Sequence, residues 1–147
     1  MATAISAPAP RHLWVVGILS LLWNAFGAYD YLMSKLGDAA YLEGMGFGAA
    51  EQAWMNAFPL WANAAWAIGV WASVVGSILL LLRSRQAVTA FLLSIAGALA
   101  SFVYQFTSDK PESLQSGLPV IMPIVILILI VAQWYYARRM SGAGVLR

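Results

Sequence analysis

Cysteine is absent from this sequence of 147 residues, and charged side chains are scarce. Without cysteine the chain has no disulfide, no thiol nucleophile, no iron–sulfur cluster and no thiolate metal site. The single histidine, His12, excludes a bis-histidine haem and a histidine-rich metal centre. Charged residues make up 10% of the chain, against about 25% in soluble domains. Eight basic and six acidic residues are too few to cover a soluble globular protein, which excludes a soluble enzyme.

Apolar residues, in contrast, are abundant. They make up 62% of the chain, and the mean hydropathy is +0.77. A helix needs roughly 20 apolar residues to cross about 30 Å of hydrocarbon, and four stretches are long enough. We expect helices because lipid-exposed backbone must satisfy its own hydrogen bonds. The sequence therefore predicts one all-α membrane domain over residues 1–147, an antiparallel four-helix bundle. Its spans are about 13–34, 57–82, 87–106 and 118–137.

The distribution of charge predicts how the chain crosses the membrane. Six of the eight basic residues fall on one side of the four spans. By the positive-inside rule, we expect the short tails 1–11 and 141–147 to be cytoplasmic, in a bacterial inner membrane. The first span exceeds the core of a signal peptide, so we expect a permanent helix. We expect the arginines to set topology and contact lipid phosphates, with no role in binding nucleic acid. The six are Arg11, Arg83, Arg85, Arg138, Arg139 and Arg147.

The connection between the first two spans is long and unusually apolar. We expect residues 37–56 to form an interfacial segment with a helical stretch from Ala49 toward Pro59. Small residues at helical spacing in the first three spans predict that these helices pack together. The fourth span lacks such a stripe, so we expect it to pack at the periphery.

Several polar residues fall within the spans or at their ends, and an ionisable residue there is a candidate for function. Asn24 is expected to form interhelical hydrogen bonds, and Gln133 to be an anchor near the inner end of its span. For Asp30 we favour an ion pair with Lys35 or Lys110 over a proton-linked role. The candidate polar site, in the outer half of the bundle, comprises Asn24, Asp30, Tyr31, Asn63, Tyr104 and Gln105.

Catalytic and metal-binding patterns are not found. No span carries His-x-x-His, Glu-x-x-His or paired acids, and His12 lies on the opposite side from the acids. The glycines Gly44, Gly46 and Gly48 follow no strand, so they indicate a flexible loop rather than a nucleotide site. We therefore expect no enzyme activity, no metal and no cofactor.

Some segments resemble known groups of proteins. Residues 22–31, LWNAFGAYDY, together with segments of 58–83 and Tyr104-Gln105-Phe106, resemble small bacterial four-span proteins of uncharacterised function, loosely labelled sugar transporters. The long first loop and the glycine-bearing second span ending in basic residues are similar in layout to the DoxX-like superfamily. Both resemblances imply a four-span membrane protein, and neither supplies a catalytic residue.

Three functions follow as hypotheses. The first is a non-enzymatic accessory or structural subunit of a larger membrane assembly, with lipids and other membrane subunits, or further copies of itself, as partners. The second is an oligomeric small-solute transporter or channel, which would require a path at a protomer interface or a cavity open to one side. The third is a quinone- or lipid-handling protein with DoxX-like redox support.

Overall fold

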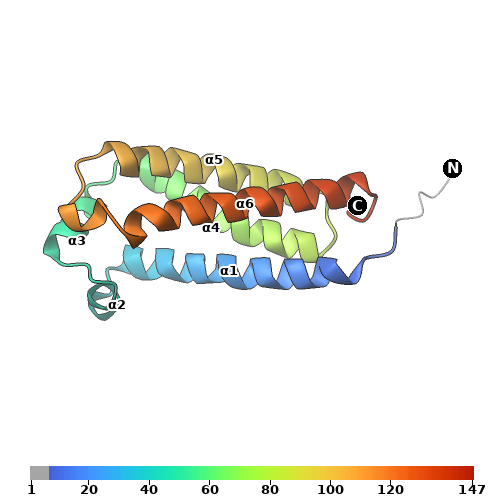
Figure 1. Cartoon of the computed structure of the whole chain (residues 1–147), viewed down its shortest axis with the longest axis horizontal. Helices are drawn as coiled ribbons and strands as arrows, with labels where there is room; N and C mark the ends of the chain where they lie inside the picture. Colours follow the sequence, from blue (N-terminus) through green and yellow to red (C-terminus); the bar gives the residue numbers. More distant parts are fainter. Residues whose placement is uncertain (1–6) are drawn as a thin grey trace.

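A computed structural model of the chain describes residues 7–147 (Figure 1). Residues 1–6 of the expected N-terminal tail lie outside the described part. The four long helices are α1 (Arg11–Leu36), α4 (Leu60–Leu81), α5 (Gln86–Thr107) and α6 (Leu118–Gly142). Two short helices, α2 (Ala39–Gly44) and α3 (Ala49–Asn56), join α1 to α4, and a 3-10 turn, η1 (Glu112–Leu114), precedes α6. The expected all-α four-helix bundle is confirmed.

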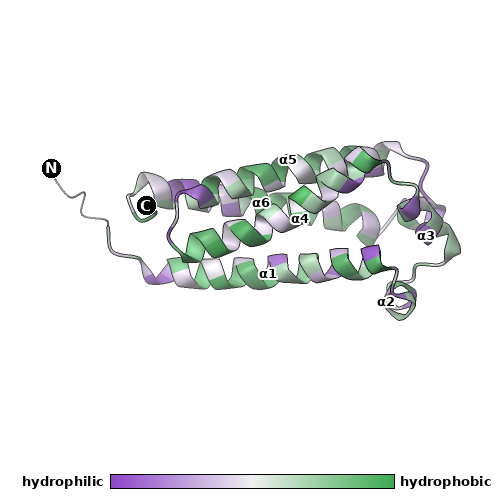
Figure 2. Cartoon of the chain, turned by 180° about the vertical axis from the view of Figure 1, so that it is seen from behind, coloured by the Kyte–Doolittle hydropathy of each residue, from purple (hydrophilic) through white to green (hydrophobic). Residues whose placement is uncertain are grey.

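The four long helices are each long and apolar enough to cross a membrane. Figure 2 shows hydrophobic residues along most of their length. α4 begins after Pro59, whose fixed φ suits the position before the first helical turn. α6 continues to Gly142 instead of ending near residue 137. The start of α1 and the end of α6 lie at one end of the bundle, and the short helices lie at the other (Figure 1).

The segment 37–56 is helical in two places. α1 ends at Leu36 and is capped by Gly37, which has φ +67°, a conformation that costs glycine little. The Asp38 carboxylate then accepts a 2.8 Å hydrogen bond from the Tyr41 amide and caps α2. α3 begins at Ala49, as expected, and its first turn is held by Glu51, whose Oε2 accepts from the Gly48 amide at 2.8 Å.

α4 and α5 form the most closely packed pair in the bundle, and small residues make this approach possible. A Cβ added at Gly97 would lie 2.6 Å from the Gly69 nitrogen and 2.7 Å from the Ala65 oxygen. The Ser94 hydroxyl donates a 2.5 Å hydrogen bond to the Gly69 carbonyl across the same contact. α1 packs on α4, which makes α4 the centre of the three helices with small-residue stripes.

α6 packs along α5 and is the least buried of the four long helices, as the absence of a small-residue stripe in this span predicts. It reaches α1 through long side chains. The Asn24 amide donates to Gln133 Oε1 at 2.9 Å, and His12 Nδ1 and the Tyr136 hydroxyl share a 2.5 Å hydrogen bond. Gln133 is buried in the bundle, so its expected role as an anchor near the inner end is wrong. Because α6 continues to Gly142, Gln133 lies more than two turns before the end of the helix and is not at its end.

Residues 143–147 close the end of the bundle at which α1 starts and α6 ends. Leu146 is fully buried in a cluster that includes Leu13 and Phe91. Arg83 donates to the carbonyl oxygens of Val145 and Ala7 at 3.0 and 2.6 Å, and Arg85 donates to that of Leu146 at 3.1 Å. Two of the arginines expected to set topology and contact lipid phosphates therefore also bind protein backbone.

Candidate functional site

Two adjoining cavities lie in the half of the bundle toward the short helices. The central cavity, of about 240 Å³, is bounded by all four long helices. The end cavity, of about 210 Å³, is bounded by the segment 37–56, the η1 region and the neighbouring ends of the long helices. Together they fall within the range of about 300–1,000 Å³ typical of small-molecule sites. The residues that line both are Asp30, Met45, Trp66, Phe102, Met122 and Ile126.

The walls of the central cavity are mostly aromatic and aliphatic. Among the described residues that line it, Asp30 is the only ionisable one, and the other polar residues are Asn24, Ser73 and Ser101. Phe26 also lines it and is 62% exposed, so the cavity reaches the apolar outer surface beside α1. The other lining residues are Trp23, Gly27, Met45, Trp66, Gly69, Val70, Ala98, Phe102, Met122, Ile126 and Ile130.

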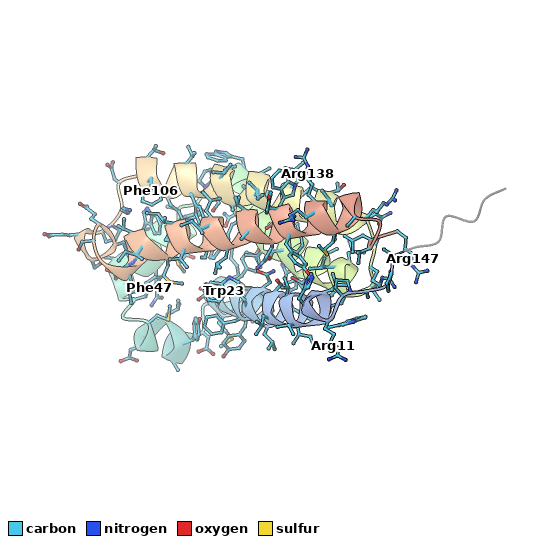
Figure 3. All side chains as sticks on the ribbon, turned by 45° about the vertical axis from the view of Figure 1, so that its right-hand side comes forward. Arg11, Trp23, Phe47, Phe106, Arg138 and Arg147 are labelled. Carbon is cyan, nitrogen blue, oxygen red and sulfur yellow. The ribbon has the colours of Figure 1, made fainter. Side chains whose placement is uncertain are left out.

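The end cavity is more polar and more aromatic. Gln105 and Lys110 line it together with Asp30, and Trp54, Phe58 and Phe106 supply further aromatic surface. In Figure 3, Trp23 of the central cavity and Phe47 of the end cavity both lie between α6 and the layer formed by α1 and α2. The apolar segment 37–56 therefore covers one end of the bundle and contributes to the cavity wall.

Asp30 lies at the junction of the two cavities. Its Oδ1 accepts a 2.6 Å hydrogen bond from the Tyr41 hydroxyl of α2. The expected ion pair with Lys35 or Lys110 is not formed among the described residues. Lys35 instead donates to Asn63 Oδ1, and its Nζ lies 5.4 Å from the centroid of the Trp66 ring. The Lys110 Nζ lies 4.6 Å from the centroid of the Phe106 ring. Both lysines are held by other groups, which leaves the carboxylate to Tyr41.

The environment of Tyr41 keeps its hydroxyl protonated. Burial raises the pKa of Tyr41 well above its ordinary value, and the hydrogen bond to Asp30 and the charge of that carboxylate raise it further. The ring also packs edge-on against Tyr29, with centroids 5.6 Å apart. Tyr41 is therefore a stable donor to Asp30.

Asn24 joins three helices at the level of the central cavity. Its Nδ2 donates to the Ser77 hydroxyl at 2.8 Å, to Gln133 Oε1 at 2.9 Å and to the Ser73 carbonyl at 3.2 Å. The side chain is buried, with 4% of its surface exposed. The expectation that Asn24 forms interhelical hydrogen bonds is confirmed.

The structure divides the six predicted site residues into two groups of three. Asn24, Asp30 and Gln105 line the cavities. Tyr31, Asn63 and Tyr104 lie outside the lining.

The residues outside the lining support the wall from behind. Tyr31 packs edge-on against Trp66, with centroids 4.9 Å apart, and Tyr104 packs against Phe58 at 4.7 Å. Asn63 Nδ2 donates to the Phe58 carbonyl at 2.9 Å, just before α4 begins. Their role here is to hold aromatic residues of the wall in place.

A polar contact fastens α3 to the η1 region beside the end cavity. The Ser113 hydroxyl donates to Glu51 Oε1, while Glu51 Oε2 accepts from the Gly48 amide. The hydrogen bond from Ser113 lowers the pKa of Glu51 below its ordinary value, and the backbone hydrogen bonds lower it further. The Trp54 indole adds a 3.0 Å hydrogen bond to the Ser108 hydroxyl. These contacts tie α3 to the chain between α5 and α6.

Several residues of the site were not predicted from the sequence. Tyr41 and Met45 lie in the connecting segment, and only its unusual apolar content could have pointed to them. Trp66 and Phe102 are indistinguishable by type from the aromatic residues that anchor helices at a membrane interface. Met122 lies on a helix without any polar pattern.

The described residues define the class of this molecule as an all-α bundle, with four helices that can span a membrane and a cavity containing one carboxylate. No group of three or more histidine, cysteine, aspartate or glutamate residues within 7–147 could hold a metal ion. No family model matches the chain, and comparisons with curated proteins and with solved structures give no match either.

Proposed function

We propose that this protein is a membrane-embedded binding protein for a small, largely apolar molecule that enters from the lipid phase. The observation that carries the proposal is the central cavity, bounded by four long helices and lined mainly by aromatic, aliphatic and thioether side chains. The exposed Phe26 in its wall supports entry from the apolar surface. This function develops the lipid- or quinone-handling hypothesis. DoxX-like membership and redox support remain predictions.

The same lining argues against a sugar as the ligand. A hydroxyl group moved from water into apolar surroundings costs several kcal/mol when it finds no partner. In the central cavity, Asn24 and Ser73 already donate hydrogen bonds within the protein. A sugar would leave many of its hydroxyl groups unpaired there. We propose a non-enzymatic role, because no serine of the described lining donates a hydrogen bond to Asp30, the carboxylate that could act as its base.

We further propose that both termini are cytoplasmic, in a bacterial inner membrane. The support is that six arginines gather at the end where α1 starts and α6 ends, whereas Lys35 and Lys110 lie at the other end. The native chain lacks cysteine, so single cysteines at exposed Ser116 and Ala143 report the two ends cleanly. An impermeant maleimide added to whole cells with a permeable outer membrane should label S116C alone. Labelling of A143C alone would show that the orientation is the reverse of the one proposed.

The second candidate is an accessory subunit of a larger assembly. It is favoured by α6, the least buried long helix, which leaves a continuous aliphatic surface for lipid or for another subunit. Native electrophoresis after mild extraction tests this role separately. A monomer at all protein levels would contradict it.

The binding function is tested by filling the cavity. Ile126 of α6 lines both cavities, whereas Ile128 on the same helix is 62% exposed. We expect Ile126→Trp to exclude the bound molecule and Ile128→Trp to be a matched control with little effect. Each variant is extracted from native membranes into polymer-bounded discs, and its small molecules are measured by mass spectrometry relative to protein.

We expect one compound to be retained near stoichiometrically by the native protein and Ile128→Trp, and to be depleted from Ile126→Trp. Thermal unfolding of all three proteins in the same discs verifies that each is folded. Equal small-molecule contents in three folded proteins would contradict the proposal.

A further inference from the structure

The position of Asp30 gives the central cavity a definite electrostatic character. Asp30 is the only ionisable residue among the described residues of the lining, so no cationic side chain from residues 7–147 lines this cavity to neutralise it. Oδ1 accepts from Tyr41, and no described residue donates to Oδ2. A carboxylate can accept about four hydrogen bonds, so Asp30 has unused accepting capacity.

The other polar groups favour a ligand of positive rather than negative charge. Asn24 Nδ2 is occupied by three acceptors of the protein, and the Ser73 hydroxyl donates to the Val70 carbonyl at 2.7 Å. An anion in this cavity would therefore find few free donors and would be repelled by Asp30.

The walls supply surface suited to an organic cation. Trp23, Trp66 and Phe102 line the cavity, and aromatic rings attract cations through their negative faces. Met45 and Met122 add polarizable sulfur atoms, which can adapt to an irregular apolar body. Lys110 lines only the end cavity, where it would repel a second cation. A bound cationic group is therefore better placed on the central side of Asp30.

We propose that the central cavity selects a small organic cation, with its charged group beside Asp30 and an apolar, preferably aromatic, body against Trp23, Trp66 and Phe102. This inference rests on the proposed binding function and specifies its ligand class. Tyr41 holds one oxygen of Asp30 while the ligand uses the other.

The test compares three probes of similar size and different charge. They are benzyltrimethylammonium, its uncharged carbon isostere neopentylbenzene, and the anion phenylmethanesulfonate. Binding to the full-length protein in lipid nanodiscs is measured by saturation-transfer NMR with competition, and empty nanodiscs correct for partitioning. The variants are Asp30→Asn, the cavity-filling Ile126→Trp, and Glu43→Gln, which neutralises an exposed acid outside both cavity linings.

We expect the cation to bind at least about tenfold more tightly than either other probe. The reason is that attraction between the cation and the Asp30 carboxylate is stronger in a partly dehydrated site than in water. Asp30→Asn should abolish this preference, and Glu43→Gln should retain it. Binding of the cation should also be lost in Ile126→Trp.

The outcomes separate the two proposals. If neopentylbenzene binds as tightly as the cation and Ile126→Trp removes both, the cavity binds ligands but the preference for cations is wrong. If Asp30→Asn retains the preference in a protein that unfolds like the native one, the assignment to Asp30 is wrong. If no probe binds in a manner that depends on Ile126, both this inference and the binding function are contradicted.

Discussion

The Tyr41 hydroxyl donates a 2.6 Å hydrogen bond to Oδ1 of Asp30, and this contact joins the short helix α2 to the long helix α1. α2 has only six residues, so it depends on contacts with the rest of the chain for its stability. The same α2 region contributes to the end cavity, where Leu42 and Met45 lie in the wall. One hydrogen bond therefore connects the carboxylate of the site to a segment that covers it.

Tyr41→Phe should loosen α2 without unfolding the bundle. A hydrogen bond to a charged group contributes roughly 1.5–3 kcal/mol, so exchange of protected amides in residues 39–44 should accelerate by about tenfold or more. Hydrogen exchange followed by mass spectrometry measures this directly. Tyr29→Phe is the matched control, because it removes a hydroxyl that donates to no described residue from the ring packed against Tyr41. Equal acceleration in both variants would contradict the role given to the hydrogen bond.

The contact between Glu51 and Ser113 should depend on pH. The pKa of Glu51 is lowered in the folded protein, so its stabilising effect is fully present above its ordinary pKa of 4.5 and is lost as the pH falls through the folded value. Exchange of residues 49–56, corrected for intrinsic rates, should accelerate when the pH falls from about 6 to about 3.

Glu51→Gln should remove this pH dependence, because an amide does not titrate in that range. Glu43→Gln, which neutralises an exposed acid on α2, should leave it intact. A native-like pH profile in the Glu51→Gln protein would mean that another group controls α3.

Asn24 and Gln133 should show energetic coupling. Their 2.9 Å hydrogen bond joins α1 to α6, which otherwise pack mainly on other helices. Interhelical hydrogen bonds in membranes contribute about 0.6 kcal/mol on average and at most about 1.7. In a double-mutant cycle with Asn24→Leu and Gln133→Leu, we expect a coupling free energy in this range. Unfolding in mixed micelles measures it, and additive effects of the two substitutions would contradict a direct contact.

The fold was predictable because it depends on properties that vary slowly along the chain. Four apolar stretches of sufficient length define the helices, and Pro59 marks the start of α4. The end of α6 was missed because its last turns contain tyrosine and arginine. These residues occur both in helices and in loops, so they do not mark where the helix ends. The fold of residues 143–147 depends on distant arginines and could not be inferred from local pattern.

The site was only partly predictable because its members come from several helices. Asn24 and Asp30 stand out as polar residues on an apolar helix, and both line the central cavity. The partner of Asp30 was predicted from charge, which favoured Lys35 or Lys110. The lysines instead contact Asn63 and aromatic rings, and a neutral hydroxyl from α2 reaches the carboxylate. Which group contacts Asp30 depends on distances in the folded protein, and these cannot be read from the separation of residues in the sequence.

The contact between Gly97 and Gly69 should limit how far the α4–α5 pair tolerates substitution. A Cβ at Gly97 would meet backbone atoms of α4 at 2.6 and 2.7 Å, and backbone atoms cannot rotate away as side chains can. Gly97→Ala should therefore separate the helices, weaken the 2.5 Å hydrogen bond from Ser94 to Gly69, and destabilise the protein by about 1–3 kcal/mol.

Gly27→Ala is the matched control, because a Cβ at that helical glycine meets nothing within 4 Å. Since alanine also favours the helix, Gly27→Ala should be neutral or stabilise the protein by up to about 1 kcal/mol. Unfolding of both variants in mixed micelles measures the difference, and equal stability of the two would contradict close packing at Gly97.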